Sequence, residues 1–279
     1  MYSELLVADP RQDKWNSLAR FLLESYKWVR KDPQLMTEEE KMLFVIACIL
    51  TGGDNETKAL LVCSQIEDVW NISLKDLTDL AAKAAIKYHS SKCQQAYETL
   101  TMIKCCYQKK LPNKRMHLEA LPGIGRHTAS VILATVFDQQ EFAVDLHVKR
   151  IMDRLGLKPT QSKTELAYER EATKYLEVSK QLGRLSRAFV DFGQDICGFT
   201  PRCNICPLEC PSRNKENKSK SALNRQLFEN KFIKDSTANL IVAVTIRAGR
   251  LNCTCASYQT QWNCSHTKEV KEKLLVHLN

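Results

Sequence analysis

Apolar residues recur at helical spacing through most of the first 210 residues. Between Trp15 and Val29 they fall on one side of a helical wheel, which predicts an amphipathic helix. Thr37 is followed by Glu40 three residues later, and this pair has the pattern of a capping box, which marks a helix start. The helix that begins there is expected to run to about Leu50, because a Thr-Gly-Gly-Asp-Asn stretch then ends it.

The rest of the chain divides into a helical part and a tail of a different kind. Helical spacing predicts further helices at residues 56–62, 73–83 and 90–106. The stretch after Pro211 is polar and is expected to be a linker, whereas residues 239–247 are mostly β-branched or apolar, which is typical of a strand. The fold class is therefore expected to be mainly α, with a small α+β module at the C-terminus.

A short segment with two glycines joins two of the expected helices. Residues 121–129 read Leu-Pro-Gly-Ile-Gly-Arg-His-Thr-Ala. Gly123 and Gly125 tolerate positive φ and let a partner approach the backbone closely. The next helix, through Thr128, presents its first amides outward, and such a helix N-terminus binds phosphate. An ordinary helix–helix turn is the other interpretation of a Gly-X-Gly pair, but the full string favours a phosphate site.

Seven of the 12 cysteines gather in two short clusters. No apolar signal segment follows Met1, so we interpret the clusters as metal sites in a reducing compartment rather than as disulfides. The first has the spacing C-x5-C-x2-C-x3-C, which four thiolates can offer to either an iron–sulfur cluster or zinc; its ligands are Cys197, Cys203, Cys206 and Cys210. The second is C-x-C-x8-C-x-H, a closed structural zinc set; its ligands are Cys253, Cys255, Cys264 and His266.

The net charge is +9, and most of the excess lies in the tail. From Pro211 onward there are 12 basic and 5 acidic residues, against 29 and 27 in the first 210. A basic tail favours a polyanion such as nucleic acid, although a solvated surface has the same composition. All apolar runs are far shorter than the ~20 residues that span a bilayer. We expect a monomeric, intracellular protein without a membrane partner.

A resemblance to a known family rests on three motifs in order. Residues 121–129 resemble the helix-hairpin-helix of the endonuclease III superfamily, the HhH-GPD DNA glycosylases. Residues 142–150, Phe-Ala-Val-Asp-Leu-His-Val-Lys-Arg, are similar to that family's Val-Asp-Thr-His segment, and the cysteine loop follows. The resemblance extends from about Leu43 to Cys210. It implies a base-excision enzyme that hydrolyses the N-glycosidic bond of a damaged, modified or mismatched base, with a pyrimidine favoured. The partner that the resemblance implies is double-stranded DNA, in the cytoplasm or nucleoid.

The resemblance also implies a domain order. A two-lobed helical core is expected, with the lesion pocket between the lobes. The predicted divisions are an iron–sulfur lobe at 1–21 and 139–210, a helical bundle with the hairpin at 22–138, a basic linker at 211–237 and a zinc module at 238–279. That last module resembles the SWIM zinc finger, whose partner could be DNA or protein.

Asp145 is the catalytic carboxylate that the resemblance implies. Breaking an N-glycosidic bond builds positive charge on the sugar, and a nearby carboxylate stabilises that charge and can orient or deprotonate the nucleophile. A purely structural role, as the N-cap of a helix at 146–155, is the alternative interpretation, and both roles are compatible.

His127 occupies the position where bifunctional members of the family carry a lysine. That lysine forms a Schiff base with the sugar and leads to strand cleavage, whereas imidazole forms no stable imine. We therefore expect a monofunctional glycosylase without lyase activity, in which His127 helps to position water or binds a phosphate. Two alternatives stay open: a bifunctional enzyme that uses another amine, for which Lys149 is the candidate, and a catalytically silent protein that binds lesions.

The remaining expectations concern the DNA contacts and the cofactors. The family implies a [4Fe–4S] cluster on the first four cysteines, in a loop whose outer spacings are shorter here than is usual. The closed set of three cysteines and one histidine, in the module that resembles a SWIM finger, predicts Zn2+. The expected DNA-binding residues are Gly123, Ile124, Gly125, Arg126, Thr128 and Arg202. Gly53 stands where endonuclease III inserts a glutamine into the DNA stack, so either Asn55 or another loop takes that role or the substrate is already weakly paired. Cys48 stands where the adenine-specific branch has a glutamate, which disfavours adenine as the target.

Overall fold

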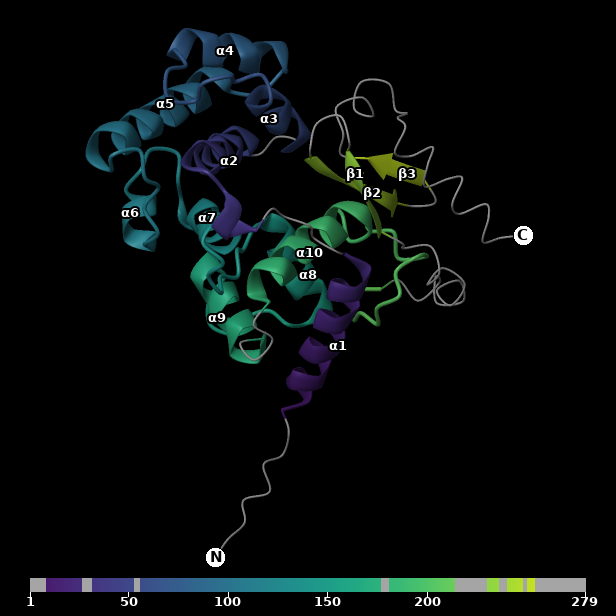
Figure 1. Cartoon of the computed structure of the whole chain (residues 1–279). Helices are drawn as coiled ribbons and strands as arrows, with labels where there is room; N and C mark the ends of the chain where they lie inside the picture. The colour runs from purple at the N-terminus through teal and green to yellow at the C-terminus, as the bar shows by residue number, and fades with distance from the viewer. Residues whose placement is uncertain are drawn as a thin grey trace, which may run out of the picture. The chain divides into compact units, whose positions relative to one another are not determined.

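The computed structural model describes residues 9–26, 32–52, 56–176, 181–213, 230–235, 240–247 and 250–253. These residues form two compact units (Figure 1). The hairpin unit contains the described residues from 32 to 141, and the cysteine unit combines residues 9–26 with the described residues from 142 to 253. None of the described helices is long and apolar enough to cross a membrane.

Among the described residues of the hairpin unit, every secondary-structure element is a helix. Its central helix, α2, starts at the predicted capping box: the Thr37 amide donates to Glu40 Oε2 at 2.8 Å, and the Glu40 amide donates to Thr37 Oγ1 at 3.3 Å. Its core includes the fully buried Leu50, Leu77 and Ile103. The elements are η1 (Pro33–Leu35), α2 (Glu38–Thr51), α3 (Glu56–Cys63), α4 (Leu74–Lys83), α5 (His89–Cys106), α6 (Arg115–Glu119) and α7 (Arg126–Val136). The helices predicted from the sequence in this unit are therefore confirmed within a few residues.

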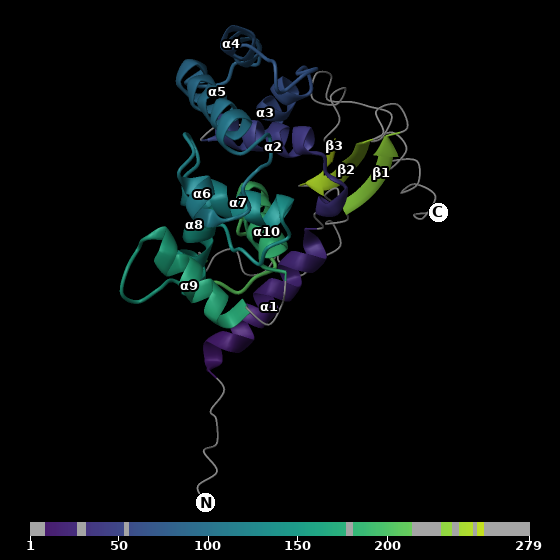
Figure 2. The same ribbon diagram turned by 60° about the vertical axis from the view of Figure 1, so that its left-hand side comes forward.

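The cysteine unit is built on aromatic packing. Phe142 meets Phe189 edge-on with ring centroids 5.6 Å apart, and Trp15 stacks on Tyr175 at 6.2 Å. Its helices are α1 (Pro10–Ser25), α8 (Leu146–Leu155), α9 (Glu165–Leu176) and α10 (Leu182–Asp195), and α1 lies beside α9 and α10 (Figure 2). The helix expected at 15–29 begins earlier, because Asp9 caps it by accepting from the Arg11 amide at 2.9 Å, and its described part ends at Ser25.

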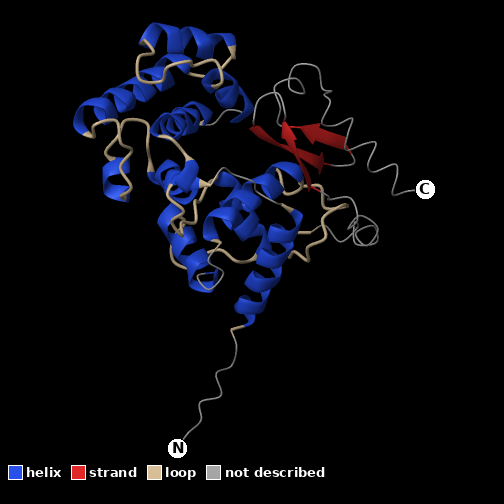
Figure 3. Ribbon diagram, in the orientation of Figure 1, coloured by secondary structure: helices blue, strands red, loops and turns tan. Residues whose placement is uncertain are grey.

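A three-stranded antiparallel sheet completes the described chain (Figure 3). Its strands are β1 (Asn230–Asp235), β2 (Leu240–Arg247) and β3 (Arg250–Cys253), in the order β1-β2-β3. β2 is the strand predicted at 239–247. β1 is a strand that the sequence did not predict, within the stretch expected to be a linker: Asn230 to Asp235 pair with Thr245 to Leu240. The sequence of β1 has only two adjacent apolar residues, too few to show the alternation that predicts a strand.

Close packing of α8 against α10 depends on Gly193. A Cβ atom built on Gly193 would lie 2.6 Å from His147 Nδ1 and 2.7 Å from His147 Cβ. The second of these atoms is close to the α8 backbone, so rotation of the imidazole alone would not relieve the clash. Glycine at this position therefore sets how closely the first turn of α8 approaches α10.

Gly193→Ala is expected to destabilise the protein by about 1–3 kcal/mol, the usual cost of overpacking a core. The change should lower the midpoint of urea unfolding. Gly198→Ala is the matched control, because the nearest atom to its added Cβ is 3.6 Å away and its φ is not positive. Equal midpoints for the two variants would contradict this account of the α8–α10 contact.

Candidate active site and metal centre

The predicted tight turn between α6 and α7 has the backbone that its glycines suggest. Gly123 has φ +75°, and a Cβ there would lie 3.1 Å from Gln95 Cβ and from Ile49 Cγ2. Thr99 Oγ1 donates to the Pro122 carbonyl at 2.7 Å and holds the turn from α5. Gly123 is therefore required by both conformation and space.

Gly125 has a different environment. It is exposed and is the N-cap of α7, with φ −87°, no side-chain cap and no atom within 4 Å of an added Cβ. Arg126, His127 and Thr128 form the first helical turn, and each is partly exposed. Ile124, predicted to contact DNA, is only 4% exposed and anchors the turn in the core. A ligand that approaches this turn would therefore meet backbone groups and the positive end of the α7 dipole.

Arg115 holds the two hairpin helices together, a role that sequence reasoning missed. From α6 it donates to Ser130 Oγ at 3.0 Å in α7 and forms ion pairs with Glu119 and Glu141. A long cationic side chain gives no signal in sequence of the acceptor that it will reach.

Asp145 caps the N-terminus of α8 and is partly exposed. Its Oδ1 accepts from the Val148 amide at 2.8 Å, and its Oδ2 makes no hydrogen bond to any described residue. The following residue, Leu146, is 75% exposed. The predicted cap and a carboxylate with one oxygen left for chemistry therefore coexist in the same side chain.

Two arginines of α8 fix the start of the cysteine loop. Arg150 donates to the carbonyls of Cys197 at 2.9 Å and Gly193 at 3.3 Å, and its third contact is His147 Nδ1 at 2.8 Å. Arg154 donates to the carbonyls of residues 197–199 at 2.7–3.2 Å. The helix that carries Asp145 is thereby tied to the loop that carries the four cysteines.

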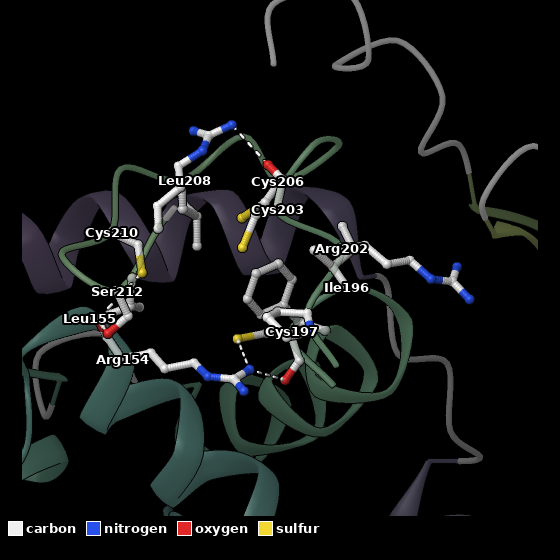
Figure 4. Close-up of a pocket in the computed structure, with 13 residues that line it drawn as sticks. Arg154, Leu155, Ile196, Cys197, Arg202, Cys203, Cys206, Leu208, Cys210 and Ser212 are labelled. Carbon is white, nitrogen blue, oxygen red and sulfur yellow. Dashed lines mark hydrogen bonds between the residues drawn. The ribbon is translucent and has the colours of Figure 1, made fainter. Parts of the chain in front are cut away.

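The four cysteines of this loop line one pocket (Figure 4). The pocket also has apolar walls from Leu155, Phe192, Ile196 and Leu208. Arg154 reaches into it, 3.3 Å from Cys197 Sγ, whereas Arg202 points away from the sulfurs and is exposed (Figure 4). The sequence spacing therefore identified four thiols that the fold does bring together.

Four thiols that line one pocket are a donor set for either zinc or an iron–sulfur cluster. In tetrahedral zinc sites with Zn–S bonds of 2.3 Å, the sulfurs lie about 3.8 Å apart. No three His, Cys, Asp or Glu side chains among the described residues lie close enough to hold one ion. Burial raises the pKa of the Cys206 thiol to about 11 and also raises that of Cys197, so metal binding at neutral pH must displace protons.

Comparison with known proteins places the chain among its relatives. No family model matches it. Endonuclease III of Rickettsia conorii is 32% identical over 190 residues, which cover 64% of this chain and 89% of the relative. Endonuclease III of Rickettsia felis is 31% identical over 190 residues, with 64% and 87% covered. The chain belongs to the endonuclease III family.

Solved structures agree with this membership at the level of the fold. A trapped covalent intermediate of endonuclease III with DNA aligns with a TM-score of 0.61 and 23% identity, over 74% of this chain and 97% of that one. A thermostable thymine-DNA glycosylase aligns with a TM-score of 0.54 and 16% identity, over 74% and 99%. The expected helix-hairpin-helix glycosylase superfamily and its mainly helical fold are confirmed.

Several predicted residues of this endonuclease III family member lie outside the described part of the chain. Gly53 is one of them, as are three of the four proposed zinc ligands, Cys255, Cys264 and His266. The fourth, Cys253, is the last residue of β3. The predicted zinc module, the predicted domain boundaries and the approach of the hairpin to Asp145 therefore stay predictions.

The two hairpin glycines are expected to respond differently to substitution. Gly123→Ala should cost about 1–2 kcal/mol of stability, because an L-residue is strained at positive φ, and its close contacts add to this. Gly125→Ser should leave stability unchanged or raise it slightly, since serine is a favoured N-cap and the site is open. Urea unfolding of both variants measures the difference, and a larger loss for Gly125→Ser would contradict the observed turn.

Proposed function

We propose that this protein is a monofunctional DNA glycosylase, in which Asp145 promotes attack of water on the sugar of an everted nucleotide. The observation that supports this most directly is the split role of the Asp145 carboxylate. Oδ1 is bound by the Val148 amide, which fixes the orientation of the group, and Oδ2 is left for water or the sugar. A fixed carboxylate stabilises the oxocarbenium-like charge without reorganising during the reaction.

Water is the proposed nucleophile because neither candidate side chain offers a suitable amine. His127 stands in the first turn of α7, where a lysine would be needed for a Schiff base. The Lys149 ammonium lies 3.5 Å from Glu165 Oε1 in an ion pair. The relatives are named endonucleases, a name that denotes strand cleavage, so this chain would differ from them in leaving an abasic site intact.

The proposed substrate is a modified or mismatched pyrimidine in double-stranded DNA. Family membership supports the nucleic-acid substrate, and the pyrimidine is carried over from endonuclease III. The DNA would be held mainly through phosphates, by the backbone around Gly125, the first turn of α7 and the exposed Arg202. Contacts of this kind make affinity fall steeply with salt.

We also propose a [4Fe–4S] cluster on Cys197, Cys203, Cys206 and Cys210, and zinc on the second cysteine–histidine set. When bound, the iron–sulfur cluster would fix the loop geometry rather than take part in bond cleavage. Arg154 would neutralise part of the negative charge that four thiolates bring to the pocket, since it already donates to Cys197 Sγ.

Asp145→Asn is expected to abolish base excision while the protein stays folded. Asparagine caps helices as well as aspartate does, so α8 keeps its start, but the amide stabilises no cationic sugar. Excision should fall by at least about 100-fold, in the range usual for loss of a catalytic acid–base group. The measurement is a panel of duplexes with modified pyrimidines, scored for strand breaks after alkali, with the thermal midpoint as the folding control.

The same panel tests the mechanism and the alternatives. Breaks that need alkali, with no covalent adduct under borohydride, are the expected result for the wild-type protein. A strong borohydride adduct would contradict the monofunctional assignment and point to an amine nucleophile. Tight binding without excision of any base would instead indicate a silent lesion-binding protein.

The purified protein is expected to contain about four irons per chain and to be brown. Cys206→Ser should lose this iron because it removes one of the four ligands. Cys105→Ser is the matched control, since Cys105 is exposed in α5 and lies outside the pocket. Elemental analysis of anaerobically purified protein gives the metal content, and wild-type protein without iron would rule out the cluster.

A further inference from the structure

A second pocket lies in the cysteine unit, formed by residues that have no role in the proposed reaction. It has a volume of about 480 Å3, and its lining residues are Arg11, Gly156, Lys158, Pro159, Thr160, Gln161, Ser162 and Lys163. Three of these carry positive charge and none carries negative charge. The first turn of α1 forms one wall, and the loop from α8 to α9 forms the other.

Hydrogen bonds and an ion pair hold both ends of the α8–α9 loop and Arg11, which together line this pocket. Gly156 ends α8 with φ +71°, and the next residue, Leu157, is fully buried and donates its amide to Met152 O at 2.8 Å. At the other end of the loop, Thr164 Oγ1 accepts from the Ala167 amide at 3.3 Å in the first turn of α9. Arg11 is held by Glu171 at 2.8 Å. The polar side chains of the loop therefore project from a backbone that is fixed at both of its ends.

The two lysines of the pocket, Lys158 and Lys163, form no ion pair with any described residue. Neither Lys158 nor Lys163 makes a hydrogen bond or ion pair with any described residue, and both are exposed. Glu171 is paired with Arg11, and the Asp9 carboxylate accepts from the Tyr175 hydroxyl at 2.8 Å and from the Arg11 amide at 2.9 Å. Three cationic side chains that line one pocket repel one another, and an anion in the pocket would relieve that repulsion.

We propose that this pocket binds a phosphate group. The ammonium groups of Lys158 and Lys163 would supply charge, and the Thr160 hydroxyl and Gln161 amide, which also lack partners among the described residues, would supply directed hydrogen bonds. Several donors without acceptors suit a group with several acceptor oxygens and a negative charge. The phosphate could belong to the DNA backbone or to a free polyphosphate, and the site does not depend on the proposed glycosylase activity.

The test uses inorganic tripolyphosphate and the full chain, by isothermal titration at constant ionic strength. The pocket variant is Lys158→Gln/Lys163→Gln. Its matched control is Lys75→Gln/Lys83→Gln, which removes the same charge from two exposed lysines of α4 that also lack partners among the described residues. We expect saturable binding to the wild type, at least tenfold weaker binding to the pocket variant and no change in the control. No saturable binding, or an equal loss in both variants, would overturn the proposal.

A second measurement identifies the source of the phosphate. Duplex affinity is followed by fluorescence anisotropy across a salt series. If the phosphate comes from DNA, the pocket variant should bind DNA more weakly than the control, with a salt slope smaller by about 1–2, and tripolyphosphate should compete. If it comes from a free polyphosphate, the two variants should bind DNA equally while the titration result stands. Both outcomes support the pocket, and they remain distinct from a failure of base excision.

Discussion

The functional part of the cysteine unit depends on how α8 is held in place. Asp145 is the N-cap of this helix, and the Val148 amide fixes the Asp145 carboxylate. Arg150, in the middle of α8, and Arg154, near its end, donate hydrogen bonds to the carbonyls at the start of the cysteine loop. Because carbonyl oxygens accept strongly from guanidinium groups, a single ten-residue helix fixes both the Asp145 carboxylate and the loop that carries the four cysteines. A shift of this helix would therefore displace the carboxylate and the four thiols together.

Glycine acts in two opposite ways around this framework. Gly193 and Gly123 are required by what surrounds them, since any side chain would meet His147 in one case and Gln95 or Ile49 in the other. Gly125 is required by none of the described residues, because none of them lies within 4 Å of an added Cβ. A glycine that the fold does not need, at an exposed helix N-terminus, is consistent with a partner that approaches the backbone closely.

Local signals in the sequence were sufficient for α1 to α5, α7 and α8 and for the four cysteines. The capping box at Thr37 and the tight turn at Gly123 were predictable because the interactions involved span only a few residues. β1 was missed because its partner strand, rather than its own pattern, defines it. The contacts of Arg115, Arg150 and Arg154 were also missed, since their acceptors are 3 to 45 residues away along the chain and most depend on the packing of helices.

The same arginines change how the positive charge of the chain relates to DNA binding. The net charge of +9 counts every basic residue equally. Arg115, Arg154 and Lys14 donate to internal acceptors, so these three basic side chains stabilise the fold and are not free to contact DNA. Arg202, Lys158 and Lys163 have no such acceptor among the described residues and can meet a phosphate without breaking an existing contact. Affinity for a polyanion should therefore follow the number and position of these unpaired cations more closely than the total charge.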